Sequence, residues 1–314
     1  MVRSTGQQNV HLRNMNYHNL VTRNLFHKIH KKQISSKIGF KKFSISLNCK
    51  DLKLNKNYFK NKICGDFGCG STGVGGINLL NLGAKYVHLV DMHKHIIKPV
   101  NRNLKKFTGK YEINIGSIEN TNFKKNYFDY ILCQGVIHHA RSDENCFKEI
   151  KRVLKPGGKC LILVQGEGGL ISDFMMKYLR PQYKKNKNIK KFIDKLMYNK
   201  ISSYKKFYLN NIDNQTKKIA KFLGHFIDES LFLTFQDIIL APKYKTYNEK
   251  KLATYLKKIG FGNIYRIKKK VSFNNLRKLL SPFYFHYKHE ISRALYGEGV
   301  VILMMTKNRH GSIY

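Results

Sequence analysis

The sequence predicts an α/β fold, a doubly wound and mostly parallel sheet of seven strands with an inserted helical cap. Between residues 61 and 165, apolar runs of strand length alternate with amphipathic helical segments five times. Such alternation is typical of a parallel sheet with helices on both faces. A glycine-rich turn, DFGCGSTG at residues 66–73, joins the first strand to the first helix. This arrangement is typical of Rossmann-like sheets.

The expected elements follow one another closely along this part of the chain. Strands are expected at 62–66, 86–90, 111–115, 127–133 and 159–164, and helices at 77–82, 96–107 and 143–154. The last of these helices is the clearest, because apolar residues recur on one face. The turn KPGG at residues 155–158 should begin the fifth strand.

After Gly169 the alternation stops, and the chain divides into four segments. The expected segments are a basic helical segment at 1–50, the Rossmann-like core at 51–169, a helical insertion that caps the substrate side at 170–235, and a C-terminal part at 236–314. In the last segment, a helix at 248–259 and strands at 263–268 and 299–306 should complete the sheet.

Composition excludes several classes of protein. The 314 residues are 42% apolar and 25% charged, which excludes a disordered chain. No apolar run approaches 18 residues, so no transmembrane helix is expected. The six cysteines have no paired spacing, which argues against a disulfide framework or zinc site and favours a reducing, cytoplasmic location. The acid-free first 50 residues also fit a mitochondrial targeting segment, which is the alternative.

The net charge of +40 would ordinarily indicate a nucleic-acid partner. The excess is spread evenly, however, at +10, +9, +9 and +12 over the four segments. Lys outnumbers Arg 48 to 11, and Arg is the usual bidentate phosphate ligand. We therefore expect any nucleic-acid binding to be nonspecific.

The glycine turn and the acidic residue after the second strand form the first candidate site. Gly68, Gly70 and Gly73 allow the backbone to turn sharply and approach a ligand. Asp91 ends the second strand, where a carboxylate can accept both hydroxyl hydrogens of a ribose. A glycine turn without a ligand, and a helix-capping role for Asp91, are the structural alternatives.

The order of these pieces resembles the class I methyltransferases that use S-adenosylmethionine. The resemblance covers about residues 60–165 and rests on four blocks: Asp66 opening the glycine turn, Asp91, GSIENTNF at 116–123, and FDYILCQGVIHHARSDENCFKEIKRVLKPGG at 128–158. The last block is similar to the subgroup of type 11-like, small-molecule methyltransferases with a GVLHH-type loop.

The resemblance implies S-adenosylmethionine as the cofactor. Its methionine part would pack on the glycine turn, and Asp91 would hold its ribose. Ser117 stands where the family usually has Asp, which leaves Ile118 as an apolar wall for the adenine. The implied cofactor neighbours are Asp66, Gly68, Gly70, Gly73, Asp91, Met92, Ser117, Ile118, Gln134 and Gly135.

Charge supports the same cofactor. A dinucleotide needs a helix N-terminus free to meet its pyrophosphate. Asp66, immediately before the glycines, would repel a phosphate but attract the ammonium group of S-adenosylmethionine. A nucleotide-dependent oxidoreductase is therefore the weaker interpretation.

Two histidines are the candidate catalytic residues. His138 and His139 follow the fourth strand, at the sheet edge where ligands bind. One of them is a candidate general base, and the alternative is that the pair shapes the loop; in an extended loop the two rings would point in opposite directions. Asp237 and Tyr247 are the candidate acceptor-binding residues, in a stretch that resembles the acceptor side of related proteins. His93 and His95 lack a third ligand, so no metal site is expected.

These observations predict a methyltransferase acting on a small-molecule acceptor. The alternatives are an RNA methyltransferase, suggested only by the basic charge, and a non-catalytic cofactor-binding partner subunit. The acceptor, the methylated atom and the oligomeric state do not follow from the sequence.

Overall fold

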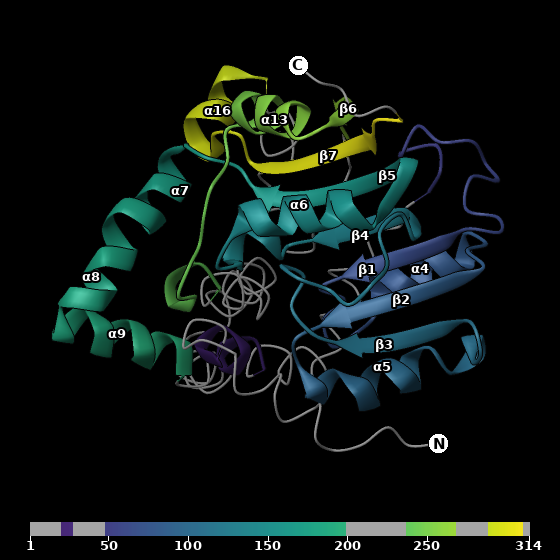
Figure 1. The fold of residues 1–314 in the computed structure, drawn as a ribbon. Coiled ribbons are helices and arrows are strands. Elements are labelled where there is room, and N and C mark those ends of the chain that lie inside the picture. The colour runs from purple at the N-terminus through teal and green to yellow at the C-terminus, as the bar shows by residue number, and fades with distance from the viewer. Residues whose placement is uncertain (1–19, 28–47, 199–236, 268–287, 310–314) are drawn as a thin grey trace, which may run out of the picture.

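The computed structural model describes residues 20–27, 48–198, 237–267 and 288–309. Its centre is one seven-stranded sheet in the order β3-β2-β1-β4-β5-β7-β6 (Figure 1). The strands are β1 Ile63–Phe67, β2 Tyr86–Asp91, β3 Tyr111–Ile115, β4 Phe128–Gln134, β5 Leu154–Gln165, β6 Phe261–Arg266 and β7 Val300–Lys307. β1 to β5 pair in parallel, and β7 runs antiparallel to both of its neighbours. The predicted fold class is confirmed.

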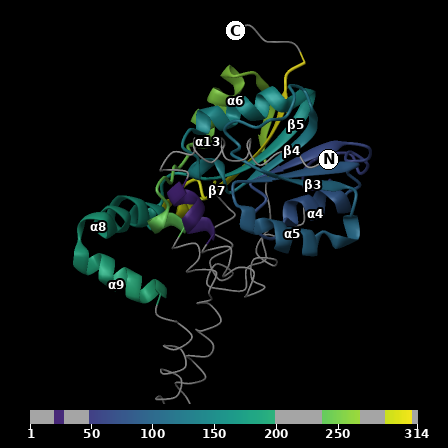
Figure 2. The same ribbon diagram turned by 60° about the horizontal axis from the view of Figure 1, so that its bottom comes forward.

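Helices cover both faces of the sheet. Figure 2 shows α4 and α5 on one side and α6 and α13 on the other. The α-helices are α4 Val74–Asn81, α5 Ile97–Asn103, α6 Asp143–Val153, α7 Leu170–Asp173, α8 Arg180–Lys185, α9 Lys187–Tyr198, α13 Glu249–Lys258 and α16 Glu290–Tyr296. Short 3₁₀ helices lie at Lys94–Ile96, Lys105–Phe107 and Ile137–His139, and a π-helical stretch spans Phe174–Leu179.

Two apolar clusters, one on each face, hold these layers together. In β4, Tyr130 and Leu132 belong to the cluster under α4 and α5, whereas Ile131 and Cys133 belong to the cluster under α6 and α13. The side chains of a strand alternate between the two faces, and both faces are buried here. The central strands therefore consist almost entirely of apolar residues.

Two predicted elements differ most from the structure, while the other boundaries lie within three residues of their predicted positions. β5 begins at Leu154 rather than Lys159, because the KPGG residues stay extended beside β4 and the pairing shifts register between Phe128 and Tyr130. The helix expected at 96–107 is broken at Leu104, where the backbone leaves the helical conformation and continues as a 3₁₀ turn.

The predicted insertion begins as expected with helices. α7, the π-helical stretch and α8 form one arm beside the sheet, and α9 turns back after Asn186, where the backbone is extended (Figure 1). The rest of the insertion, residues 199–235, and most of the predicted segment 1–50 lie outside the described residues. No helix in the described ranges is long and apolar enough to cross a membrane. All six cysteines are free thiols and buried.

Candidate active site

The glycine turn lies between β1 and β4, where the strand order reverses. At this switch point parallel sheets bind their ligands, beyond the carboxyl ends of the strands. Gly68 has a φ of 81°, and a Cβ there would lie 2.1 Å from Val136 Cγ2. Only glycine therefore lets this turn pack against the loop that follows β4.

Asp66 lies beneath this turn and is 4% exposed. Its carboxylate accepts the N–H of Gly76 at 2.8 Å, in the first turn of α4. A Cβ on Gly75 would lie 2.6 Å from Asp66 Oδ2, so the glycine gives the carboxylate its room. The pKa of Asp66 is raised to about 7, mainly by burial; the hydrogen bond from Gly76 opposes this rise, and the charge of Asp91 makes a smaller contribution to it. The observed contact of Asp66 is with α4, and its predicted contact with the cofactor's ammonium group stays a prediction.

Asp91 ends β2 and holds the turn from the side. Its Oδ2 accepts the N–H of Gly70 at 3.0 Å, and its Oδ1 accepts the backbone N–H of His93 at 3.0 Å. The His93 Nδ1 lies 2.7 Å from the same Oδ1. The carboxylate thus links the glycine turn to the residues after β2. Its predicted contact with the ribose of the cofactor stays a prediction.

The helix at residues 20–27 covers this edge of the sheet. The His93 ring nitrogen Nε2 is hydrogen-bonded to the carbonyl oxygen of Arg23, and the ring of Phe26 packs edge-on against His139 at a centroid distance of 4.8 Å. Thr22 is buried. The sequence predicts a helical segment within residues 1–50, but the contacts of this helix with His93 and His139 were not predicted.

The remaining predicted cofactor neighbours line the same edge. Ile118 is 5% exposed, in the apolar cluster beside Phe67 and Val90. The Ser117 hydroxyl accepts the backbone N–H of Glu119 at 3.2 Å. A Cβ at Gly135 would meet no atom within 4 Å, so there is open space above this residue. Met92 and Gln134 are half-buried.

The two histidines do not lie in an extended loop, so the expectation of opposed rings is wrong. Ile137–His139 form a 3₁₀ turn, and the rings of His138 and His139 pack at a centroid distance of 4.1 Å. Asp237 joins them, with its Oδ1 3.1 Å from His139 Nε2. Burial lowers the pKa of His138 to about 3, and the charge of His139 adds to this effect. The two predicted catalytic residues and one of the two predicted acceptor-binding residues, Asp237, therefore meet in one cluster.

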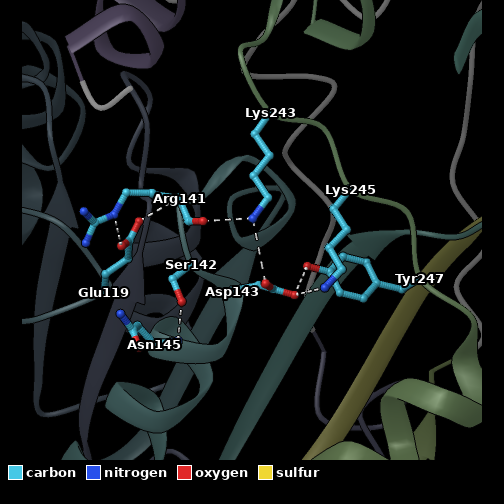
Figure 3. A network of polar contacts seen from close by, with 8 residues as sticks. All are labelled: Glu119, Arg141, Ser142, Asp143, Asn145, Lys243, Lys245 and Tyr247. Atoms are coloured by element: carbon cyan, nitrogen blue, oxygen red, sulfur yellow. Dashed lines mark hydrogen bonds and ion pairs between the residues drawn. The ribbon is translucent and has the colours of Figure 1, made fainter. Parts of the chain in front are cut away.

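A polar network holds the segment after Asp237 against this turn (Figure 3). Asp143 Oδ2 accepts Lys245 Nζ at 2.6 Å and the Tyr247 hydroxyl at 3.0 Å. Lys243 Nζ donates to the carbonyl oxygen of Arg141 at 2.9 Å. Burial alone would raise the pKa of Asp143, but the hydrogen bond and charge of Lys245, with further help from Tyr247, hold it below its usual value.

Tyr247 itself belongs to the core. It is 5% exposed, and its backbone N–H donates to the carbonyl oxygen of Gln165 at 2.9 Å. Its observed position is that of an anchor for the segment 243–247, and its predicted contact with an acceptor stays a prediction.

Arg180 is a residue that sequence reasoning missed. Its guanidinium is 8% exposed in α8 and donates to the carbonyl oxygens of Ile238 at 2.5 Å, Ala241 at 2.6 Å and Pro242 at 3.0 Å. It thereby fixes the insertion to the segment that carries Asp237. No local pattern signals this role, since the contacts span about 60 residues of sequence.

These residues fit S-adenosylmethionine. The hydroxyl of Ser71, inside the glycine turn, is buried and has no hydrogen-bond partner among the described residues, so it is available to a ligand. The edge also offers backbone groups, a carboxylate at the end of β2 and the apolar Ile118. A sulfonium nucleoside carrying an amino acid needs this mixture of polar and apolar groups.

Part of the chain matches a known family. Residues 65–162, less than half of the chain, match the family described as "Methyltransferase domain". Phosphoethanolamine N-methyltransferase 2 of Caenorhabditis elegans is 32% identical over 113 residues, which are 35% of this chain and 25% of that protein. The chain thus spans about a quarter of this curated relative's length.

A solved structure of a methyltransferase complex has the same fold. A chain in the complex of the Haloferax volcanii methyltransferase activator Trm112 with a methyltransferase matches with a TM-score of 0.52 and 10% identity, over 93% of this chain and 99% of that one. Phosphoethanolamine N-methyltransferase 2 of Haemonchus contortus, solved with phosphomonomethylethanolamine and S-adenosylhomocysteine, matches with a TM-score of 0.46 and 15% identity, over 83% and 52%. The family match and the fold together identify residues 65–162 as a class I S-adenosylmethionine-dependent methyltransferase domain.

Proposed function

We propose that the whole chain is a methyltransferase that transfers the methyl group of S-adenosylmethionine to a small-molecule acceptor. The observation that carries this proposal is that three features lie at the switch point: the glycine turn, Asp91, and the cluster of His138, His139 and Asp237. The first two fit the cofactor, and the third provides polar groups beside it for an acceptor.

In this proposal the glycine turn and Asp91 hold the cofactor, with Ser71 as a further hydrogen-bond partner. Bound S-adenosylmethionine supplies an electrophilic methyl group on a sulfonium. Its transfer is an in-line displacement, so alignment of the acceptor provides much of the rate. The chain's contribution is to fix the loop after β4 rigidly and to exclude water from the site.

The histidine cluster is proposed as the acceptor face. His138 and His139 are anchored on the core side by Ile137, which is 1% exposed, and on the other side by the segment 243–247. Lys245 donates its backbone N–H to the carbonyl oxygen of His138 at 2.9 Å. Rigid attachment supports a positioning role for both rings, and a general-base role for either one is the alternative.

A small molecule is favoured over RNA because the positive charge is spread evenly over the four segments of the sequence rather than concentrated in one of them. The name of the Caenorhabditis relative suggests phosphoethanolamine as the first acceptor to test. That relative matches over 113 residues, 35% of this chain, so a panel of amines, phosphorylated amines, phenols and tRNA is needed.

Transfer of a radiolabelled methyl group from S-adenosylmethionine tests the proposal. The wild-type chain should label at least one small amine, phosphoamine or phenol. Asp91→Ala should lose this activity, whereas Asp51→Ala, which removes an exposed carboxylate on a turn, should keep it. Labelling of tRNA alone would support the RNA alternative. Tight cofactor binding without transfer to any acceptor would support a non-catalytic subunit.

A further inference from the structure

His138, His139 and Asp237 form a cluster of metal-ligand type. Each residue offers one ligand atom, and these atoms all lie within 4.8 Å of one another. The two histidines come from the 3₁₀ turn after β4, and Asp237 comes from a segment about 100 residues later. Two adjacent histidines and a carboxylate from a distant part of the sequence thus lie close enough to bind one ion.

The tautomer of His139 is fixed by its surroundings. The His139 Nδ1 lies 3.1 Å from the carbonyl oxygen of Lys243. A carbonyl oxygen can only accept a hydrogen bond, so Nδ1 carries the hydrogen. Histidines that bind metals through one ring nitrogen usually donate the other N–H to a carbonyl or carboxylate in this way.

The other nitrogen of His139 then faces a carboxylate. With the hydrogen on Nδ1, neutral His139 has a lone pair on Nε2, 3.1 Å from Asp237 Oδ1. Two lone pairs at this distance repel each other unless a positive charge lies between them or one group is protonated. A spacing of 3.1 Å between two ligand atoms is close to that on a tetrahedral ion with bonds of about 2.0–2.1 Å.

His138 supplies an independent observation. The ring is 5% exposed, and its Nδ1 has no hydrogen-bond partner among the described residues. A buried, unsatisfied ring nitrogen is costly, and it needs a ligand or water. The Tyr244 ring packs against the His138 ring at a centroid distance of 5.2 Å.

We propose that His138, His139 and Asp237 bind a divalent metal ion of the zinc class. Two imidazoles and one carboxylate are donors that suit Zn²⁺, and three protein ligands leave a fourth position open. In the methyltransferase, an oxygen or nitrogen of the acceptor would take that position; this role rests on the proposed function, but binding of the ion does not. The sequence predicted no metal site because His93 and His95 lack a third ligand. The approach of Asp237 to His138 and His139 could not be predicted from the sequence.

The competing occupant is a proton. An imidazolium on His139 would also satisfy Asp237, without any metal. The experiment must therefore distinguish a metal ion from a proton, and it must not depend on catalysis.

Titration calorimetry with Zn²⁺ alone, on the chelator-treated full chain without cofactor, makes this distinction. The wild type should bind one equivalent. Asp237→Asn and His139→Ala should weaken Zn²⁺ binding by roughly 100-fold or more. Removing a group that only hydrogen-bonds to a metal ligand already costs about 10- to 100-fold in affinity, and these two residues are proposed as ligands themselves. His95→Ala is the matched control, because it removes an exposed imidazole outside the cluster, and it should bind like the wild type.

A second measurement does not require any variant to fold. Co²⁺ bound to the wild-type chain should give visible bands of a tetrahedral site without thiolate charge transfer, which excludes the cysteines as ligands. The proposal is overturned if the wild type binds no stoichiometric Zn²⁺, or if NMR shows that His139 Nε2 keeps its hydrogen in excess Zn²⁺. Calorimetry of S-adenosylhomocysteine on the same metal-free sample reports separately on the proposed function.

Discussion

Asp66 and Asp91 lie on neighbouring strands of the same site but have different surroundings. Asp91 accepts two backbone N–H groups and contacts the His93 ring, whereas Asp66 is enclosed beneath the glycine turn with the N–H of Gly76. Desolvation disfavours the charged form of a carboxyl group. The pKa of Asp66 is accordingly raised, to about 7.

The raised pKa predicts how stability depends on pH. Below the unfolded-state pKa of about 3.9, the carboxyl is protonated in both states. Between about pH 4 and 7 the folded state binds the proton and the unfolded state does not, so Asp66 makes stability fall as the pH rises through this window. Asp66→Asn keeps an acceptor for Gly76 but does not titrate. Denaturant unfolding at pH 4.5 and 7.5 should show a smaller loss of stability in Asp66→Asn than in the wild type, and equal losses would contradict the assignment.

At the scale of elements, the site depends on contacts that join distant parts of the chain. α8 is fixed to the segment 238–242 by Arg180, and the segment 243–247 is fixed to α6 by Asp143. The helix at 20–27 is fixed to the end of β2 by His93. Together these contacts enclose the edge at which the cofactor and acceptor are expected.

Removing the guanidinium of Arg180 tests this description. Arg180→Met leaves several buried carbonyl groups without their donor, and we expect a loss of about 3 kcal/mol in the free energy of unfolding. Hydrogen exchange should also become faster at 238–247. Arg102→Met is the control, because Arg102 is an exposed residue of α5, and the substitution should change stability little. Equal effects of the two substitutions would show that Arg180 is not an anchor.

The sequence predicted elements better than contacts between them. β3 was predicted at its observed bounds, and α6 within one residue, because their apolar periodicity is strong. The positions of the glycine turn after β1 and of Asp91 at the end of β2 were also predicted, since they are fixed by the order strand, turn, helix, strand. Their contacts with a cofactor stay predictions. The approach of Asp237 to His139 was not predicted, because the path of 199–236 has no local signal that would place it. The contacts of Arg180 were missed for the same reason.

At the scale of the whole molecule, the net charge of +40 is the dominant surface property. We predict that nucleic acids bind through it without selectivity. Filter binding over a salt series should show affinity falling steeply with salt and varying little with RNA sequence or fold. A tight, salt-resistant complex with one RNA would contradict this prediction and support an RNA acceptor.

The central claim is that the chain binds S-adenosylmethionine at the edge formed by the glycine turn and Asp91. Titration calorimetry with the demethylated product, S-adenosylhomocysteine, tests it most directly. The wild type and Asp51→Ala should bind it alike, and Asp91→Ala should bind more weakly by about 1.5 to 3 kcal/mol, the contribution of a hydrogen bond to a charged group. No binding by the wild type would contradict the cofactor assignment, and unchanged affinity in Asp91→Ala would remove Asp91 from the site.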